Sequence, residues 1–143
     1  MKTRLGYDDR DRFLDIVRAV AAAGASELTV HARTRRHGYR PPAYWEEIAR
    51  AREICKLPLI ANGEIWSPGD ALRCREVARC EDLMLGRGVL CRPDLPRLVK
   101  AAAAGAHPAP LTWHQVLPLV RRFYDLNLSH YEAHYAPNPL KQW

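Results

Sequence analysis

The chain has 143 residues, of which 48% are hydrophobic and 27% are charged, and these values are typical of one globular domain with its own core. They exclude a collagen, a long coiled coil and a wholly disordered chain, and no apolar run reaches the roughly 18 residues of a membrane span. The net charge is +6 and the pI is about 9.4, which favours acidic partners such as nucleic acid.

Four short apolar segments are predicted to be strands. Residues 2–6 have the composition of a strand end, and residues 28–31, 57–62 and 83–86 are nearly continuous apolar runs. Such runs are typical of buried parallel strands. They recur at intervals of roughly 30 residues, the length of a βαβ unit.

Helical patterns fill the intervals between these strands. The first has apolar residues at i, i+3, i+4 and i+7 from Phe13, with Asp8 and Asp9 as candidate N-caps. The second begins near Trp45. The third begins at residues 67–70, a capping box with proline at the first helical position.

Repeated strand–helix units predict an α/β fold with a parallel sheet and right-handed crossovers. The candidates are a doubly wound sheet or an incomplete (βα)8 TIM-type barrel. Since a full barrel takes about 250 residues, residues 1–95 suffice for about half of one. Residues 96–110 are predicted to be a linker, and residues 111–143 the start of a partial α-helical domain.

The cysteines and the N-terminus point to a cytoplasmic protein. Cys55, Cys74, Cys80 and Cys91 form no CxxC pair, so free thiols are expected and no metal site is predicted. The first ten residues lack the apolar core of a secretory signal. We therefore expect no membrane partner.

Polar or cationic residues follow every predicted strand. In parallel α/β proteins functional side chains gather at the C-terminal ends of the strands. Each of these polar or cationic residues, taken singly, has an ordinary structural interpretation, such as a tight turn at residues 62–63 or a hydrogen-bonded core histidine at residue 31. Agreement among four strand ends favours a shared site. Its candidates are Lys2, Arg4, His31, Arg33, Asn62, Gly63, Glu64, Gly86 and Arg87.

The chemistry of these residues suits a phosphorylated ligand. Gly63 and Gly86 allow the backbone to approach an anion, and Arg87 has a guanidinium that can bind phosphate bidentately. Lys2 and His31 follow neighbouring strands. Their side chains suit the electron-rich edge of a flavin-type ring, where a cation stabilises the reduced anionic form.

A basic loop follows the second predicted strand. Residues 33–40 contain four arginines, one histidine and one tyrosine. A solvated basic loop is one interpretation; contact with RNA phosphates and stacking on a base is the other. The location on the same rim favours RNA, with Arg4, Arg33, Arg35, Arg36, Tyr39 and Arg40 as candidates.

Four motifs, in order, resemble the tRNA-dihydrouridine synthases. They are K-T-R-L-G at 2–6, L-T-V-H-A-R-T at 28–34, L-I-A-N-G-E-I at 59–65 and L-M-L-G-R-G at 83–88. Three further patterns are similar to the C-type subfamily, which modifies a D-loop uridine. These are N-G-E-I-W at 62–66, W-x-x-I at 45–48 and L-K-Q-W at 140–143.

The resemblance implies a flavin-binding barrel followed by a helical tRNA-binding domain, with this chain covering the second half of the barrel. It implies NADPH-driven, FMN-dependent reduction of the D-loop uridine at position 16 to dihydrouridine, with the target base flipped from its stack. It also implies FMN contacts at Lys2, His31, Asn62, Gly63, Glu64, Gly86 and Arg87, and tRNA contacts at Arg4 and in residues 33–40.

The chain departs from the family pattern in one important respect. The family's proton donor is a cysteine in an N-x-G-C-P loop, and none of the four cysteines here lies in that motif. No catalytic residue is therefore assigned. The chain is expected to be a fragment that is inactive alone and self-associates through exposed barrel edges.

Two other functions remain open at this point. One is a non-catalytic module that binds phosphate or RNA. The other is a half-barrel that binds a sugar phosphate, since phosphate-binding loops recur in many enzymes and a fold does not fix a function.

Overall fold

A computed structural model describes residues 1–141. Four parallel strands form one sheet in chain order, β1 (Lys2–Arg4), β2 (Leu28–His31), β3 (Leu59–Asn62) and β4 (Asp82–Met84). The predicted α/β class and all four strand positions are confirmed. The consecutive order lacks the reversal that defines a doubly wound sheet.

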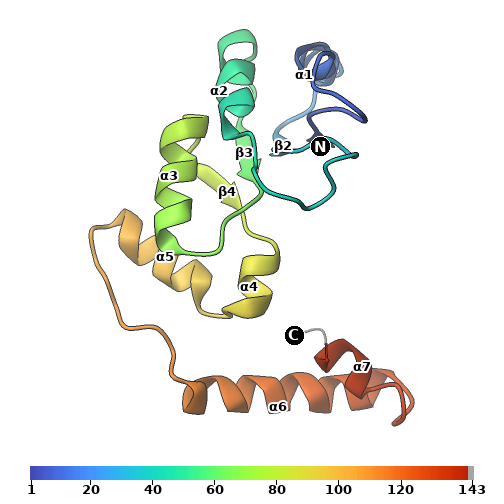
Figure 1. Ribbon diagram of the computed structural model, residues 1–143, viewed down its shortest axis with the longest axis vertical. Helices are drawn as coiled ribbons and strands as arrows, with labels where there is room; N and C mark the ends of the chain where they lie inside the picture. The colour runs from blue at the N-terminus through green and yellow to red at the C-terminus, as the bar shows by residue number, and fades with distance from the viewer. Residues whose placement is uncertain (142–143) are drawn as a thin grey trace.

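Seven helices complete the described part of the chain. Three lie between the strands, and four follow the sheet (Figure 1). They are α1 (Phe13–Ala22), α2 (Trp45–Ile54), α3 (Pro68–Ala78), α4 (Arg87–Cys91), α5 (Leu95–Ala103), α6 (Trp113–His130) and α7 (Pro137–Leu140).

The helix starts show where local sequence signals succeed. The capping box before α3 is confirmed, because Ser67 Oγ accepts from the Asp70 N–H at 3.1 Å and Asp70 Oδ2 accepts from the Ser67 N–H at 2.9 Å. The N-caps expected at Asp8 and Asp9 for α1 are wrong. That helix has Arg12 at its N-cap position, and Asp9 instead accepts from the Asp11 N–H in the preceding turn.

The two faces of the sheet differ in chemistry. Leu28 and Val30 of β2, and Leu59 and Ala61 of β3, belong to the buried core that α1, α2 and α3 complete. The pairing register places Arg4, His31, Asn62 and Met84 side by side at the last position of each strand. Because side chains alternate along a strand, this row lies on the face opposite the core residues Val30 and Ala61.

The predicted linker needs a correction. Helix α5 covers residues 96–103 of the segment 96–110, so the irregular connection begins only at residue 104. An alanine-rich sequence favours helix once Leu95, Leu98 and Val99 can be buried on one side. The connection is fastened to α5, since Asp94 accepts from the Leu111 N–H at 2.9 Å and Arg97 donates to the Ala109 carbonyl at 2.9 Å.

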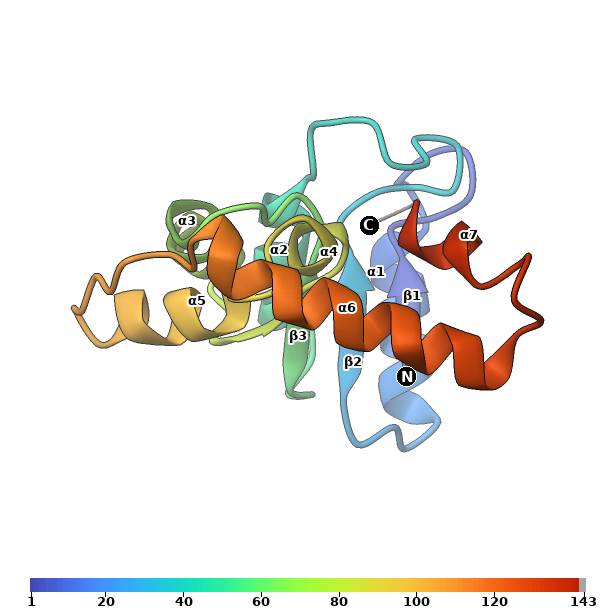
Figure 2. The ribbon, with the colours of Figure 1, turned by 90° about the horizontal axis from the view of Figure 1, so that it is seen from below.

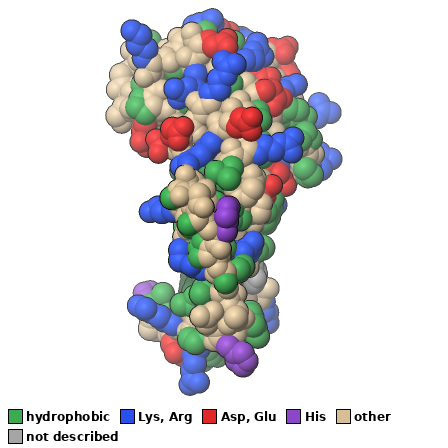
Figure 3. All heavy atoms as spheres, turned by 90° about the vertical axis from the view of Figure 1, so that its left-hand side faces the viewer, with side chains coloured by type: hydrophobic (Ala, Val, Ile, Leu, Met, Phe, Trp, Pro, Cys, Tyr) green, Lys and Arg blue, Asp and Glu red, His purple; other side chains and the backbone are tan. Residues whose placement is uncertain are grey.

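Helices α6 and α7 lie apart from the sheet, on the side to which the strands' C-terminal ends point (Figures 1 and 2). Figure 3 shows a narrow waist between the part that contains the sheet and the part that contains α6. The L-K-Q-W motif at 140–143 ends at residues 142–143, which lie outside the described residues. The edges of the sheet are β1 and β4, and self-association through them stays a prediction.

No helix among residues 1–141 has both the length and the apolar composition needed to cross a membrane.

Candidate functional site

A cavity of about 540 Å³ opens at the C-terminal ends of the four strands. Residues from the ends of all four strands and the segments after them line it. Among them are all seven candidates for cofactor contact, namely Lys2, His31, Asn62, Gly63, Glu64, Gly86 and Arg87. Three of the six RNA candidates, Arg4, Arg33 and Tyr39, line the same cavity. The structure therefore brings these residues together, and their roles stay predictions.

The cavity is electropositive. Burial and, in decreasing order, the neighbouring charges of Arg4, Arg33, Lys2 and Arg87 together lower the pKa of His31 to about 4. The imidazole is therefore neutral at pH 7, and the charge around it comes from the four cations. Such a site favours an anionic ligand.

Two further side chains that line the cavity, those of Asn62 and Lys2, contact Met84 of β4. Asn62 donates from Nδ2 to the Met84 carbonyl at 2.7 Å, which orients its amide across the gap between β3 and β4. Lys2 is exposed and lies with Nζ 3.2 Å from Met84 Sδ, so its ammonium reaches the opposite edge of the cavity. Both residues are therefore presented to a ligand by the sheet itself.

Gly63 is required by the geometry of its turn. Its φ is +122°, and a Cβ there would lie 3.1 Å from His31 Cδ2 and 3.5 Å from a guanidinium nitrogen of Arg33. Its carbonyl accepts from Trp45 Nε1 at 2.9 Å, which ties the turn to the start of α2. Gly86 differs, because a Cβ there would meet open space, so its backbone faces the cavity without obstruction.

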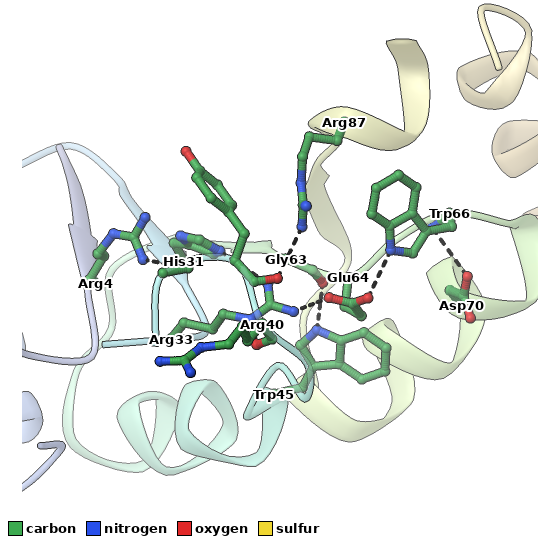
Figure 4. Close-up of polar contacts among 12 residues, drawn as sticks. Arg4, His31, Arg33, Arg40, Trp45, Gly63, Glu64, Trp66, Asp70 and Arg87 are labelled. Carbon is green, nitrogen blue, oxygen red and sulfur yellow. Dashed lines mark hydrogen bonds and ion pairs between the residues drawn. The ribbon is translucent and has the colours of Figure 1, made fainter. Parts of the chain in front are cut away.

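Arg33 is an internal residue. Its side chain is fully buried and forms an ion pair with Glu64. It also donates to the Arg40 carbonyl at 2.7 Å, and its Nη1 lies 3.3 Å from His31 Nε2 (Figure 4). This burial counts against the RNA contact expected of Arg33. The guanidinium instead holds the loop after β2 against the turn after β3.

The other residues expected to contact RNA divide into two groups. Tyr39 lines the cavity, and Arg4 secures the loop by donating to the carbonyls of Thr34 and Gly38 at 3.0 Å each. Arg35, Arg36 and Arg40 are exposed and lie outside the lining of the cavity. They are available to a large anion that covers the rim.

Arg87 lies between two aromatic rings. Its guanidinium carbon is 4.7 Å from the centre of the Tyr39 ring and 4.9 Å from that of Trp66. The site analysis of the sequence missed Trp66 as a lining residue. The N-G-E-I-W motif contains Trp66. Its position two residues after the candidate Glu64 was the signal in the sequence that could have identified it.

The cysteines do not take part in the cavity. Cys74 and Cys80 are buried, and burial raises the pKa of Cys74 to about 12 and raises that of Cys80. No cysteine is among the residues that line the cavity in the described part of the chain. Residues 1–141 also contain no group of three or more histidine, cysteine or acidic side chains placed to hold a metal ion.

The structure defines the class as parallel α/β proteins whose polar side chains gather around a cavity at the C-terminal ends of the strands. Comparison with known proteins narrows this class. The profile of the dihydrouridine synthase (Dus) family matches residues 1–137, and the chain belongs to this family.

Several curated relatives share the name tRNA-dihydrouridine(16) synthase. The protein from Pseudomonas syringae pv. tomato is 48% identical over 142 residues, which are 99% of this chain and 45% of the relative. The protein from Pseudomonas putida is 47% identical over 99% of this chain and 44% of the relative. The protein from Vibrio cholerae is 40% identical over 99% of this chain and 43% of the relative. The chain thus spans less than half the length of these relatives.

Proposed function

We propose that this chain is the second half of the catalytic barrel, with the start of the helical domain, of a C-type tRNA-dihydrouridine synthase. The complete enzyme reduces uridine 16 of tRNA to 5,6-dihydrouridine in the cytoplasm, with FMN as cofactor and NADPH as reductant. The names of the relatives support the substrate and the position. The role of this chain is to hold FMN and to contact tRNA.

One observation carries the proposal: seven residues chosen from four separated motifs line a single cavity. The motifs span residues 2 to 87, so chance placement in one cavity is improbable for residues of such mixed type.

The cavity residues fit FMN on structural grounds. Arg87 is exposed at the rim beside the unobstructed backbone of Gly86, an arrangement suited to the terminal phosphate. Lys2 of β1 and neutral His31 of β2 line the same cavity, where they suit the ring edge. The carboxylate of Glu64 is neutralised by Arg33, which reduces its repulsion of an anion.

When bound, FMN supplies the hydride that saturates the C5–C6 bond of uracil. The residues of this chain orient it: the Asn62 amide and the Gly63 turn fix the middle of the cavity, and the cations bind its anionic groups. Proton donation needs a group beyond these, since the described cavity lining contains no cysteine. We therefore propose that the isolated chain is inactive.

Contact with tRNA is proposed for the exposed side chains of the basic loop. Arg35, Arg36 and Arg40 lie beside the cavity rather than in it, which suits phosphates flanking a base that enters it. The helical segment α6 lies on the same side of the sheet (Figure 1). The net charge of +6 is consistent with this partner.

Equilibrium dialysis of the purified chain tests the cofactor assignment. FMN should bind, and Arg87→Ala should weaken binding at least about tenfold, the loss expected for a charge-assisted contact. Arg12→Ala is a matched control, because Arg12 is exposed and lies outside the lining of the cavity. Retention of ribose 5-phosphate with no retention of FMN would contradict the proposal and favour the sugar-phosphate alternative.

A second test addresses activity. The chain incubated with FMN, NADPH and unmodified tRNA should form no dihydrouridine. Detection of dihydrouridine by mass spectrometry of the digested tRNA would overturn the proposed inactivity and require a proton donor within this chain.

A further inference from the structure

We propose that Trp66 is a positioning residue that holds Arg87 in place for the phosphate of the cofactor. The inference rests on the proposed FMN site and adds to it a residue outside the seven candidate contacts. Trp66 takes this role through the face of its indole ring, while its ring N–H fixes the ring itself.

Two hydrogen bonds define where Trp66 lies. Its Nε1 donates to Glu64 Oε1 at 2.9 Å, and its backbone N–H donates to Asp70 Oδ2 at 3.1 Å (Figure 4). Asp70 belongs to the capping box of α3, and Glu64 is paired with buried Arg33. Trp66 is therefore attached through its backbone to the start of a helix, and through its ring N–H to the ion pair of Glu64 and Arg33.

Arg87, by contrast, has few rigid contacts of its own. It is exposed at the first position of the short helix α4, and within residues 1–141 its side chain donates a single long hydrogen bond, 3.4 Å to the Tyr39 carbonyl. Its guanidinium lies 4.9 Å from the centre of the Trp66 ring. A cation on an aromatic face is held without using its N–H donors, which remain free for a phosphate.

The second aromatic contact of Arg87 is of a different kind. Tyr39 is 61% exposed and lies on the basic loop, whereas Trp66 is partly buried and fixed at two polar points. A ring held in this way restricts the guanidinium more than an exposed ring does. The geometry therefore points to Trp66 as the element that orders Arg87 before the ligand arrives.

The test compares FMN with riboflavin, which lacks the phosphate, on the purified chain. Trp66→Leu removes the aromatic face and should weaken FMN binding about two- to fivefold, clearly more than it weakens riboflavin binding. Trp66→Phe keeps a face for Arg87 and should stay within about twofold of the wild type for both flavins. Trp113→Leu is a control, because Trp113 is exposed on the distant helix α6.

Coupling to Arg87 is the decisive readout. In the Arg87→Ala background, Trp66→Leu should cause no further loss of FMN affinity. Equal losses for FMN and riboflavin, or losses that add in the double variant, would overturn the positioning role. If FMN binding depends on Arg87 but not on Trp66, only this inference fails. If the wild-type chain binds neither flavin, both the proposed cofactor site and the positioning role of Trp66 fail.

Discussion

The buried guanidinium of Arg33 forms an ion pair with the carboxylate of Glu64, which joins the loop after β2 to the turn after β3. Arg33 has no exposed side-chain surface, whereas the Glu64 side chain is 27% exposed. Both residues line the cavity, as do their hydrogen-bond partners Trp66 and His31. Arg33, although arginine is usually a surface residue, is thus a buried residue that holds two segments of the site together.

Loss of this pair should destabilise the fold. Arg33→Ala is expected to lower the free energy of unfolding by roughly 3 kcal/mol, because Glu64 then loses its counter-charge and a buried cavity forms. Urea denaturation measures the change. Arg12→Ala removes an exposed arginine that is 82% accessible and should change stability by less than about 0.5 kcal/mol. Equal effects of the two substitutions would contradict the structural role of Arg33.

Stability should fall in mildly acidic solution because of His31. Its folded pKa of about 4 lies below the ordinary value of 6.5, so the unfolded chain takes up the proton first as the pH falls. The stabilisation is complete above pH 6.5 and is lost progressively toward pH 4, by up to about 3 kcal/mol. His31→Gln should flatten this part of the curve relative to the wild type. Parallel curves for the two proteins between pH 6.5 and 4 would refute the assignment.

The turn after β3 should not tolerate a side chain. Gly63→Ala places a Cβ against His31 and Arg33 at a φ of +122°, so we expect a loss of about 1–3 kcal/mol in stability and weaker FMN retention. Gly69→Ala is the matched control, because its Cβ would meet only Ser67 Oγ at 3.7 Å in the first turn of α3. Thermal unfolding and dialysis check both variants. Wild-type behaviour of Gly63→Ala would show that the turn adapts.

The exposed part of the basic loop should govern tRNA affinity. Arg35→Ala with Arg36→Ala removes two accessible cations, and the slope of log affinity against log salt should fall by about two. Gel-shift titrations over a range of salt concentrations measure this slope. The pair Arg12→Ala with Arg18→Ala removes the same charge from α1. If the control weakens binding as much, the interaction is a general effect of net charge.

The sequence sufficed for the strands and the rim because these depend on local signals. Continuous apolar runs ending in polar residues mark buried parallel strands, and the end of a strand fixes which residues reach the rim. The capping box at Ser67 and Asp70 is likewise local. For α1, the aspartates at 8 and 9 precede the helix by several residues and satisfy a different turn.

The remaining features depend on tertiary contacts. Nothing adjacent to Arg33 indicates that its partner is Glu64, 31 residues further along the chain, so a basic loop suggested a surface arginine. The contact between Trp66 and Arg87 also joins two different strand ends. Helix α5 was missed in part because alanine-rich segments suit both linkers and helices, and burial of Leu95, Leu98 and Val99 decides between them.

The most direct test of the site is a titration of the isotopically labelled chain with FMN, followed through its backbone amide NMR signals. The account predicts shifts concentrated at the strand ends, at His31, Gly63, Gly86 and Arg87, with the signals of α6 unchanged. Shifts located elsewhere, or no shifts at FMN concentrations that saturate dialysis binding, would contradict it.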